Sequence, residues 1–88
     1  MPLISQFYGI LIYIYRELNT QHNRPHVHAR FAGDDMSISF DGEILAGDLP
    51  KKQKKLVEAW VALHEDELNA AWTVLIENGE IIKIKGLE

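Results

Sequence analysis

Two short segments of the chain alternate strictly between apolar and polar residues, and this pattern constrains the fold more than any other feature. The segments are residues 26–31 and 36–41, and their apolar members are Val27, Ala29, Phe31, Met36, Ile38 and Phe40. Successive side chains of a β-strand point to opposite faces of the sheet, so each segment predicts a strand with one buried face. On the other face of the first segment we expect His26, His28 and Arg30 to be accessible to solvent.

Turn residues connect these segments into a meander. Residues 32–35 have the composition of a turn, and Asp41-Gly42 is a strong signal for a type I′ hairpin, in which both central residues have positive φ. Residues 43–46 then return as a short strand, which gives three antiparallel strands. Residues 4–15, rich in Ile, Tyr and Phe and apolar on both faces, predict one further strand ahead of the meander.

The second half of the chain predicts two helices. Apolar residues recur at helical spacing from Leu56 to Leu75, Pro50 suits a first helical turn, and Asp48 is a candidate cap. The acidic residues 65–67 suit the start of a second helix, because anions are stabilised at the positive end of the helix dipole. We therefore expect helices over 50–63 and 65–77, with a bend at His64 and a left-handed stop at Asn78-Gly79.

Residues 80–87 predict a last strand that adds to the sheet, with Ile82 and Ile84 facing inward. The whole chain of 88 residues is then one domain of the α+β class. Its expected architecture is a mostly antiparallel sheet of four to five strands, with the two helices of the C-terminal half packed on one face.

Several classes of protein are excluded or disfavoured by what the chain lacks. It contains no cysteine, which excludes disulfide scaffolds, zinc fingers and thiol nucleophiles. Its longest apolar run is too short to span a membrane and its start does not resemble a signal peptide, so we expect a cytoplasmic protein. A net charge of −4 disfavours general attraction to nucleic acid. The charge is uneven, however: residues 56–88, with two lysines against seven acids, account for −5, and residues 1–55 carry +1.

Three histidines and two arginines lie close together without an acid among them: His22, Arg24, His26, His28 and Arg30. One hypothesis is acid–base chemistry on a phosphodiester of RNA, with one imidazole as base, another as acid and an arginine holding the phosphate. A second is a site for Zn²⁺ or another divalent transition metal on His22, His26 and His28. The third interpretation is a solvated polar face with no chemistry. The neighbouring arginines favour an anion over a cation.

Two further features extend the first hypothesis. His64 and Glu67 lie inside the apolar stripe of the helices, where they either face the histidine strand or mark the helix bend. Lys51, Lys52 and Lys55 belong to a cationic run at a helix start, which opposes the helix dipole. With Arg24 these lysines are candidates for binding phosphate, and the alternative is ordinary solvation of a helix surface.

The motifs together resemble a small bacterial family, domain of unknown function 4160. The resemblance is carried by residues 2–10, by Pro25-His26-Val27-His28-Ala29, by residues 42–50, and by Trp60, His64 and Glu67-Leu68. The chain departs from the family in one place, since Arg24-Pro25 stands where two prolines are common. The resemblance implies a gene beside that of a second small protein, in an arrangement that looks like a toxin–antitoxin pair.

The leading hypothesis is therefore a toxin-like component of a two-gene module that acts on RNA without a metal. Its candidate catalytic residues are His22, His26, His28, Arg30 and His64. The first alternative is a non-catalytic module that binds a small partner protein through an exposed sheet edge or the acidic helix, and a homodimer is a further option. The second alternative is a metal-binding domain.

Overall fold

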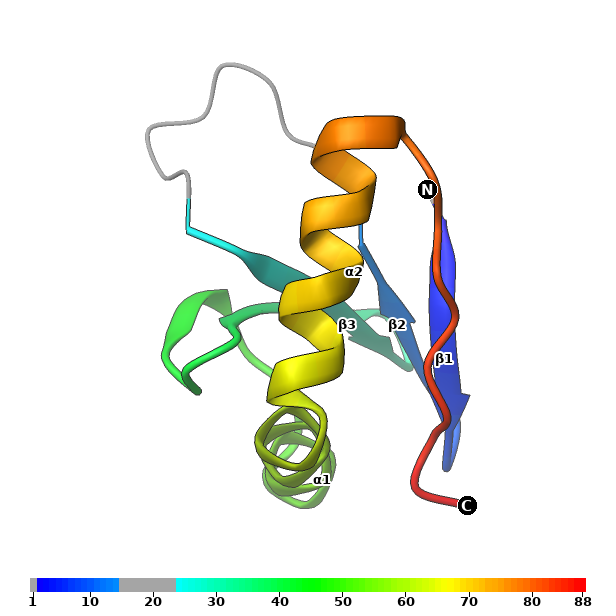
Figure 1. Cartoon of the computed structure of the whole chain (residues 1–88). Helices are drawn as coiled ribbons and strands as arrows, with labels where there is room; N and C mark the ends of the chain where they lie inside the picture. Colours follow the sequence, from blue (N-terminus) through cyan, green and yellow to red (C-terminus); the bar gives the residue numbers. More distant parts are fainter. Residues whose placement is uncertain (1, 15–23) are drawn as a thin grey trace.

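The computed structural model describes residues 2–14 and 24–88, and it places five strands in one antiparallel sheet with the order β1-β2-β3-β4-β5 (Figure 1). The strands are β1 (Leu3–Phe7), β2 (Ile10–Tyr13), β3 (His26–Phe31), β4 (Asp34–Ser39) and β5 (Ile44–Gly47). Two helices follow, α1 (Lys51–Leu63) and α2 (Glu65–Asn78). The expected α+β class and the two helices of the C-terminal half are confirmed.

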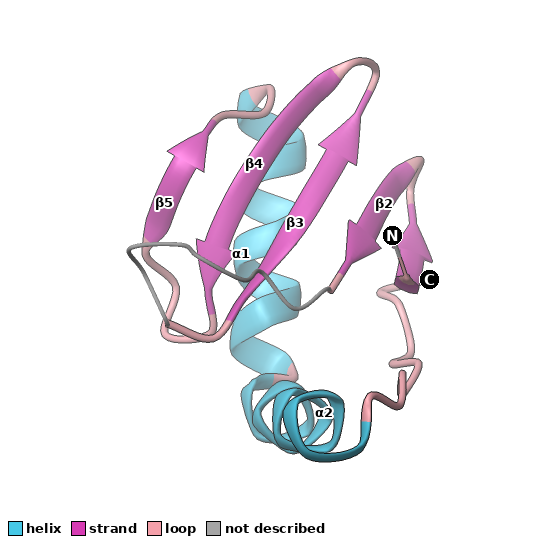
Figure 2. Cartoon of the chain, turned by 90° about the horizontal axis from the view of Figure 1, so that it is seen from above, coloured by secondary structure: helices cyan, strands magenta, loops and turns pink. Residues whose placement is uncertain are grey.

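The helices and one face of the sheet enclose a single core. In Figure 2, α1 lies behind β3 and β4, and α2 crosses the end of the sheet at a steep angle to α1. The alternating residues Val27, Ala29, Met36 and Ile38 are fully buried, together with Trp60 of α1. The alternation therefore predicted the buried face of both strands correctly, because a register shift by one residue would have exposed all of these side chains.

Residues 4–14, the described part of the segment 4–15, do not form the single strand that we expected. They form the hairpin of β1 and β2, closed by Tyr8 and Gly9, whose φ values of 49° and 79° are both positive. Ala32 and Gly33 close the β3–β4 hairpin in the same way, with φ values of 49° and 90°. Two-residue turns with positive φ at both positions match the twist of the strands that they join, and a glycine adopts this conformation at little cost.

The connection between β4 and β5 corrects a second expectation. A hairpin does form at Asp41-Gly42, but Gly42 has a positive φ and Asp41 does not, so the turn is not type I′. The turn is wider, with the Gly42 N–H donating to the Ser39 carbonyl at 2.9 Å and the Ser39 N–H donating to the Glu43 carbonyl at 2.8 Å. Ser39 is therefore the residue that organises this loop.

The helix pair agrees with the sequence in its bounds and in its bend. The chain changes direction at His64, and Gly79 ends α2 in the left-handed conformation with φ 71°. The expected cap at Asp48 is wrong, because Pro50 precedes α1 and no side chain caps that helix. Within the described part of the chain, neither helix is long and apolar enough to cross a membrane.

The C-terminal residues cover the outer edge of β1 without forming the strand that we predicted. They run beside β1 (Figure 1), and the Ile84 N–H donates to the Ile4 carbonyl at 2.8 Å. Ile84 is buried as expected, whereas Ile82 is 40% exposed, contrary to expectation. Gly86 allows a close approach, since a Cβ atom there would lie 2.8 Å from the Gln6 carbonyl oxygen.

Candidate functional site

The structure brings His26 and His28 together at the start of β3. Their ring centroids are 5.0 Å apart in an edge-to-face arrangement. His28 lies directly across from Tyr13 on β2 and from Ser37 on β4, and its Nδ1 shares a 3.1 Å hydrogen bond with the Ser37 hydroxyl. We call these four residues, with Arg30, the histidine face.

His26 is not accessible in the way that the alternation suggested, because only 6% of it is exposed. Its Nδ1 donates to the Arg24 carbonyl oxygen at 2.7 Å, since a carbonyl can only accept. Its ring centroid lies 5.8 Å from that of Trp72 on α2. The strand period was correct, but it could not show that α2 packs against this end of the strand.

Arg30 remains exposed, as expected, but its charge is balanced by an acid. Its Nε donates to Asp35 Oδ1 at 2.8 Å across the β3–β4 pair, and its Cζ lies 5.9 Å from the centroid of the Tyr13 ring. Residues 22–30 contain no acid, whereas the register of β3 and β4 places Asp35 directly opposite Arg30. The cation that was expected to hold a phosphate is thus engaged by a carboxylate.

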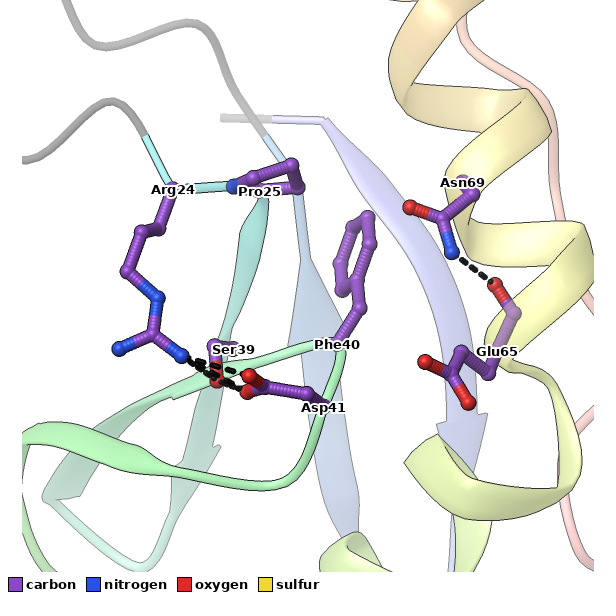
Figure 3. A pocket seen from close by; sticks show the side chains of 7 residues that line it. All are labelled: Arg24, Pro25, Ser39, Phe40, Asp41, Glu65 and Asn69. Atoms are coloured by element: carbon purple, nitrogen blue, oxygen red, sulfur yellow. Dashed lines mark hydrogen bonds and ion pairs between the residues drawn. The ribbon is translucent and has the colours of Figure 1, made fainter.

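Arg24, which precedes β3, is the centre of a second polar cluster, and its partners lie on the loop between β4 and β5 (Figure 3). Its guanidinium donates to Asp41 at 2.8 Å and to Glu43 at 2.5 Å, and the Ser39 hydroxyl also donates to Asp41. The hydrogen bond with Glu43 raises the pKa of Arg24, despite partial desolvation. The hydrogen bond from Ser39, together with the charge of Arg24, lowers the pKa of Asp41.

This cluster borders a pocket of about 160 Å³. Arg24 and Asp41 meet on one side of the pocket, and Glu65 and Asn69 of α2 line the opposite side (Figure 3). Pro25, Ser39 and Phe40 complete the lining. Of the predicted site residues, Arg24 lines this pocket, but it is held there by acids of its own chain.

His64 lies at the junction of the two helices. Its Nδ1 donates to Glu67 Oε1 at 2.6 Å, and its ring centroid is 5.4 Å from that of Trp60. These described contacts belong to the helix bend, whereas those of His26 are with Arg24, His28 and Trp72. These contacts fit the interpretation of His64 as a marker of the bend, with the Glu67 carboxylate as its hydrogen-bond partner.

The lysine run lies at the opposite end of β3 from Arg24. The Asp48 N–H donates to the Asp35 carbonyl at 3.0 Å, so the start of α1 lies near the acid that pairs with Arg30. Lys54 forms an ion pair with Asp48 at 3.3 Å, and Lys51, Lys52 and Lys55 are exposed. The candidate phosphate-binding residues Arg24 and Lys51 are therefore not brought together.

The metal hypothesis depends on a residue outside the described part of the chain. His22 lies in residues 15–23, so the expected set of His22, His26 and His28 cannot be assembled. Among residues 2–14 and 24–88, no group of three potential ligands could hold a metal ion. The hypothesis therefore stays a prediction.

The sequence reasoning missed the acidic partners. Asp35, Asp41 and Glu43 were interpreted as turn or strand residues, although each neutralises an arginine of the candidate site. The only signal available was the expected meander, which places residues 34–41 opposite residues 26–31. The side-chain partners follow from the exact register, which the composition of a turn does not specify.

Comparison with known proteins identifies a family. The model of a family described only as a domain of unknown function matches residues 9–73, most of the chain. No curated protein and no solved structure matches it.

Proposed function

Because the chain belongs to the DUF4160 family, a domain of unknown function, we propose a role for it from its surface: it is a protein-interaction module. A strand of the partner pairs with the outer edge of β5. The observation that carries this proposal is the difference between the two edges of the sheet.

Among the described residues, one edge of the sheet is covered and the other is open. The C-terminal segment runs along the outer side of β1 and contributes the hydrogen bond between Ile84 and Ile4. β5 is the last strand at the other edge, and within the described chain its sheet neighbour is β4 alone. Figure 2 shows no described element on its outer side. An outer strand presents unpaired N–H and C=O groups, which form a template for another strand.

The composition of β5 supports the same proposal. Its sequence, Ile-Leu-Ala-Gly, carries no charge and no proline, the residues that commonly protect an open edge. One feature of β5 weighs against pairing: Leu45 is skipped in the register with β4, since Ile44 pairs with Ile38 and Ala46 with Ser37, and such a bulge is among the features that protect an open edge. The natural candidate for the partner is the small neighbouring protein that the family resemblance implies, which would make the chain one component of a two-gene, toxin–antitoxin-like module.

The test is co-expression of the chain with the protein encoded beside it, followed by affinity capture and size-exclusion chromatography. We expect Ala46→Lys to abolish the complex, because Ala46 is exposed on β5 and a lysine disfavours edge pairing. Ala70→Lys, an equal change on the exposed surface of α2, is the control and should leave the complex intact. A complex that survives Ala46→Lys and Leu45→Pro would contradict the proposal, and self-association lost in the same variants would indicate a homodimer instead.

A second candidate function is acid–base chemistry on RNA, and the contact between His26 and His28 favours it. Because Nδ1 of His26 holds a proton against the Arg24 carbonyl, the neutral ring has Nε2 as its basic atom. A second imidazole 5.0 Å away is suited to the complementary acid role. Against this candidate, Arg24 and Arg30 are both paired with carboxylates.

The RNA candidate has its own experiment. Purified protein is incubated with total RNA in EDTA, and growth is scored when the chain is expressed without its neighbour. Cleavage by this mechanism should fall ~10²–10⁴-fold in His28→Ala and should peak near neutral pH. Intact RNA and normal growth with the wild-type chain would exclude this function and leave the interaction module.

A further inference from the structure

A pocket lies between β1 and the C-terminal segment that runs beside it (Figure 1). Within the described chain, a single backbone hydrogen bond joins the two, from the Ile84 N–H to the Ile4 carbonyl. A second close approach follows at Gly86, where a Cβ atom would clash with the Gln6 carbonyl. The pocket has a volume of about 270 Å³ and is lined by residues 3–6 of β1 and by Lys83, Ile84 and Gly86. We call it the Ser5 pocket.

We propose that the Ser5 pocket binds a small aliphatic carboxylate. Three observations carry this inference: a buried hydroxyl without a partner, an apolar wall, and a single cation that the fold does not neutralise. The inference goes beyond the proposed interaction module and does not depend on it, because β1 and β5 are opposite edges of the sheet.

The hydroxyl of Ser5 is the first observation. Ser5 is only 7% exposed, and its hydroxyl forms no hydrogen bond with any described residue. Its partner in the β1–β2 register is the fully buried Ile12, so the hydroxyl stands among apolar side chains. Burial of a hydroxyl without a partner costs free energy, and such groups are rare in native structures. A ligand in the pocket can supply the missing hydrogen bond.

The second observation is the apolar wall of the same pocket. Ile4 and Ile84 are buried on its two sides, and Leu3 is half-buried beside them. Small-molecule sites are mostly apolar and carry few polar groups, which orient the ligand. This wall favours a ligand with a branched aliphatic tail, because the tail is removed from water against it. A purely polar ion would leave the wall unused.

The third observation is the charge of Lys83. It is the only charged side chain in the lining, and it forms no ion pair with any residue of the ranges 2–14 and 24–88. One cation selects an anionic head group with a single charge. A carboxylate can accept from the Lys83 ammonium and from the Ser5 hydroxyl together, since the lysine stem is long and flexible.

The experiment is a titration of ¹⁵N-labelled full-length chain with 4-methylpentanoate at pH 7, followed by NMR. We expect saturable shifts at the amides of Ser5, Gln6 and Gly86, with a Kd on the order of millimolar for so small a ligand. Acetate, which has the charge without the tail, should give no saturable shift. The neutral 4-methylpentanamide should bind more weakly, because it does not attract Lys83.

Matched variants identify the site. Ser5→Ala and Lys83→Gln should each weaken binding by about threefold to tenfold, because each removes one hydrogen bond to the carboxylate. Lys85→Gln removes the charge of an exposed lysine that does not line the pocket, and it should leave binding unchanged. The result would overturn the inference if 4-methylpentanoate gave no saturable shift, if acetate or the amide bound equally well, or if both pocket variants kept full binding.

Discussion

The indole Nε1–H of Trp60 donates a hydrogen bond to the backbone carbonyl of Lys85, with 2.9 Å between the nitrogen and the oxygen. Trp60 is fully buried, and its ring centroid lies 5.6 Å from that of Phe7 on β1. One side chain of α1 thus contacts the edge strand of the sheet and also the C-terminal segment that covers that strand. The C-terminal segment that covers β1 is therefore held in part by Trp60, a fully buried residue of the core.

The first prediction concerns this link. Trp60→Phe should lower the free energy of unfolding by about 2–3 kcal/mol, because it removes buried volume and leaves the Lys85 carbonyl without its donor. Urea denaturation measures the loss. Trp72→Phe is the matched control and should cost about 1 kcal/mol or less, since Trp72 is half-buried and a phenyl ring keeps the contact with Phe40. Equal losses in the two variants would contradict the role of the hydrogen bond.

The second prediction concerns Ser5 on β1. Its hydroxyl is buried and has no hydrogen-bond partner among the residues that the structure describes. Ser5→Ala should therefore raise the free energy of unfolding by about 1 kcal/mol, because the cost of an unsatisfied polar group is removed. Ser39→Ala should have the opposite effect, since the Ser39 hydroxyl bonds Asp41 and accepts from the Glu43 N–H. A loss of stability in Ser5→Ala would indicate that the hydroxyl has a partner.

The third prediction is a pH dependence of stability. The pKa of Asp41 is lowered in the folded chain by the Ser39 hydrogen bond and by Arg24, so its contribution to stability is complete above the ordinary aspartate pKa. That contribution is lost as the pH falls through the lower, folded value. Asp41→Asn should thus be less stable than wild type at pH 7, and the difference should shrink below about pH 4.

Thermal unfolding between pH 2 and pH 7 measures this difference. Asp34→Asn, an exposed change at the start of β4, removes the same charge without touching Arg24 and is the control. If both variants approach the wild type equally at low pH, the effect belongs to the overall charge and not to the Arg24 cluster.

Most of the fold was predictable from local patterns in the sequence. The errors in the predicted fold have physical causes. The alternation in residues 26–31 indicates which face of the strand is buried, and the spacing of apolar residues does the same for the helices. These patterns are reliable because burial of the apolar face dominates the stability of strands and helices alike. The Tyr8-Gly9 turn was missed because tyrosine is not a usual residue at positive φ. The Ala32-Gly33 turn, with the same conformation, was recognised only as a turn.

The candidate site was less predictable, because it depends on contacts between elements. The burial of His26 follows from α2, and the neutralisation of Arg30 follows from the exact register of β3 and β4. Neither is encoded in the histidine spacing. The pocket beside Arg24 is likewise lined by both Asp41 and Glu65, which are far apart in the sequence and line one pocket only because the β4–β5 loop lies beside the start of α2.

The fourth prediction concerns the helix bend. His64→Ala should lower the free energy of unfolding by about 1–2 kcal/mol, because the side chain packs on Trp60 and donates to Glu67 at the point where α1 ends. Glu67→Gln keeps an acceptor oxygen and should cost less. The far-ultraviolet circular dichroism signal during urea denaturation measures both. If His64→Ala were as stable as wild type but lost a binding or cleavage activity, His64 would have a functional role instead.

The last prediction addresses the metal hypothesis. We expect no saturable binding of Zn²⁺ at pH 7.5 by calorimetry, because Nδ1 of His26 is committed to the Arg24 carbonyl and Arg30 lies on the same strand as both histidines. A site completed by His22 would behave differently. It would bind one ion per chain, and its affinity would fall below about pH 6 as the imidazoles protonate. Loss of that binding in His28→Ala, with Zn²⁺ still bound in His64→Ala, would assign the metal to the histidine face and overturn the prediction.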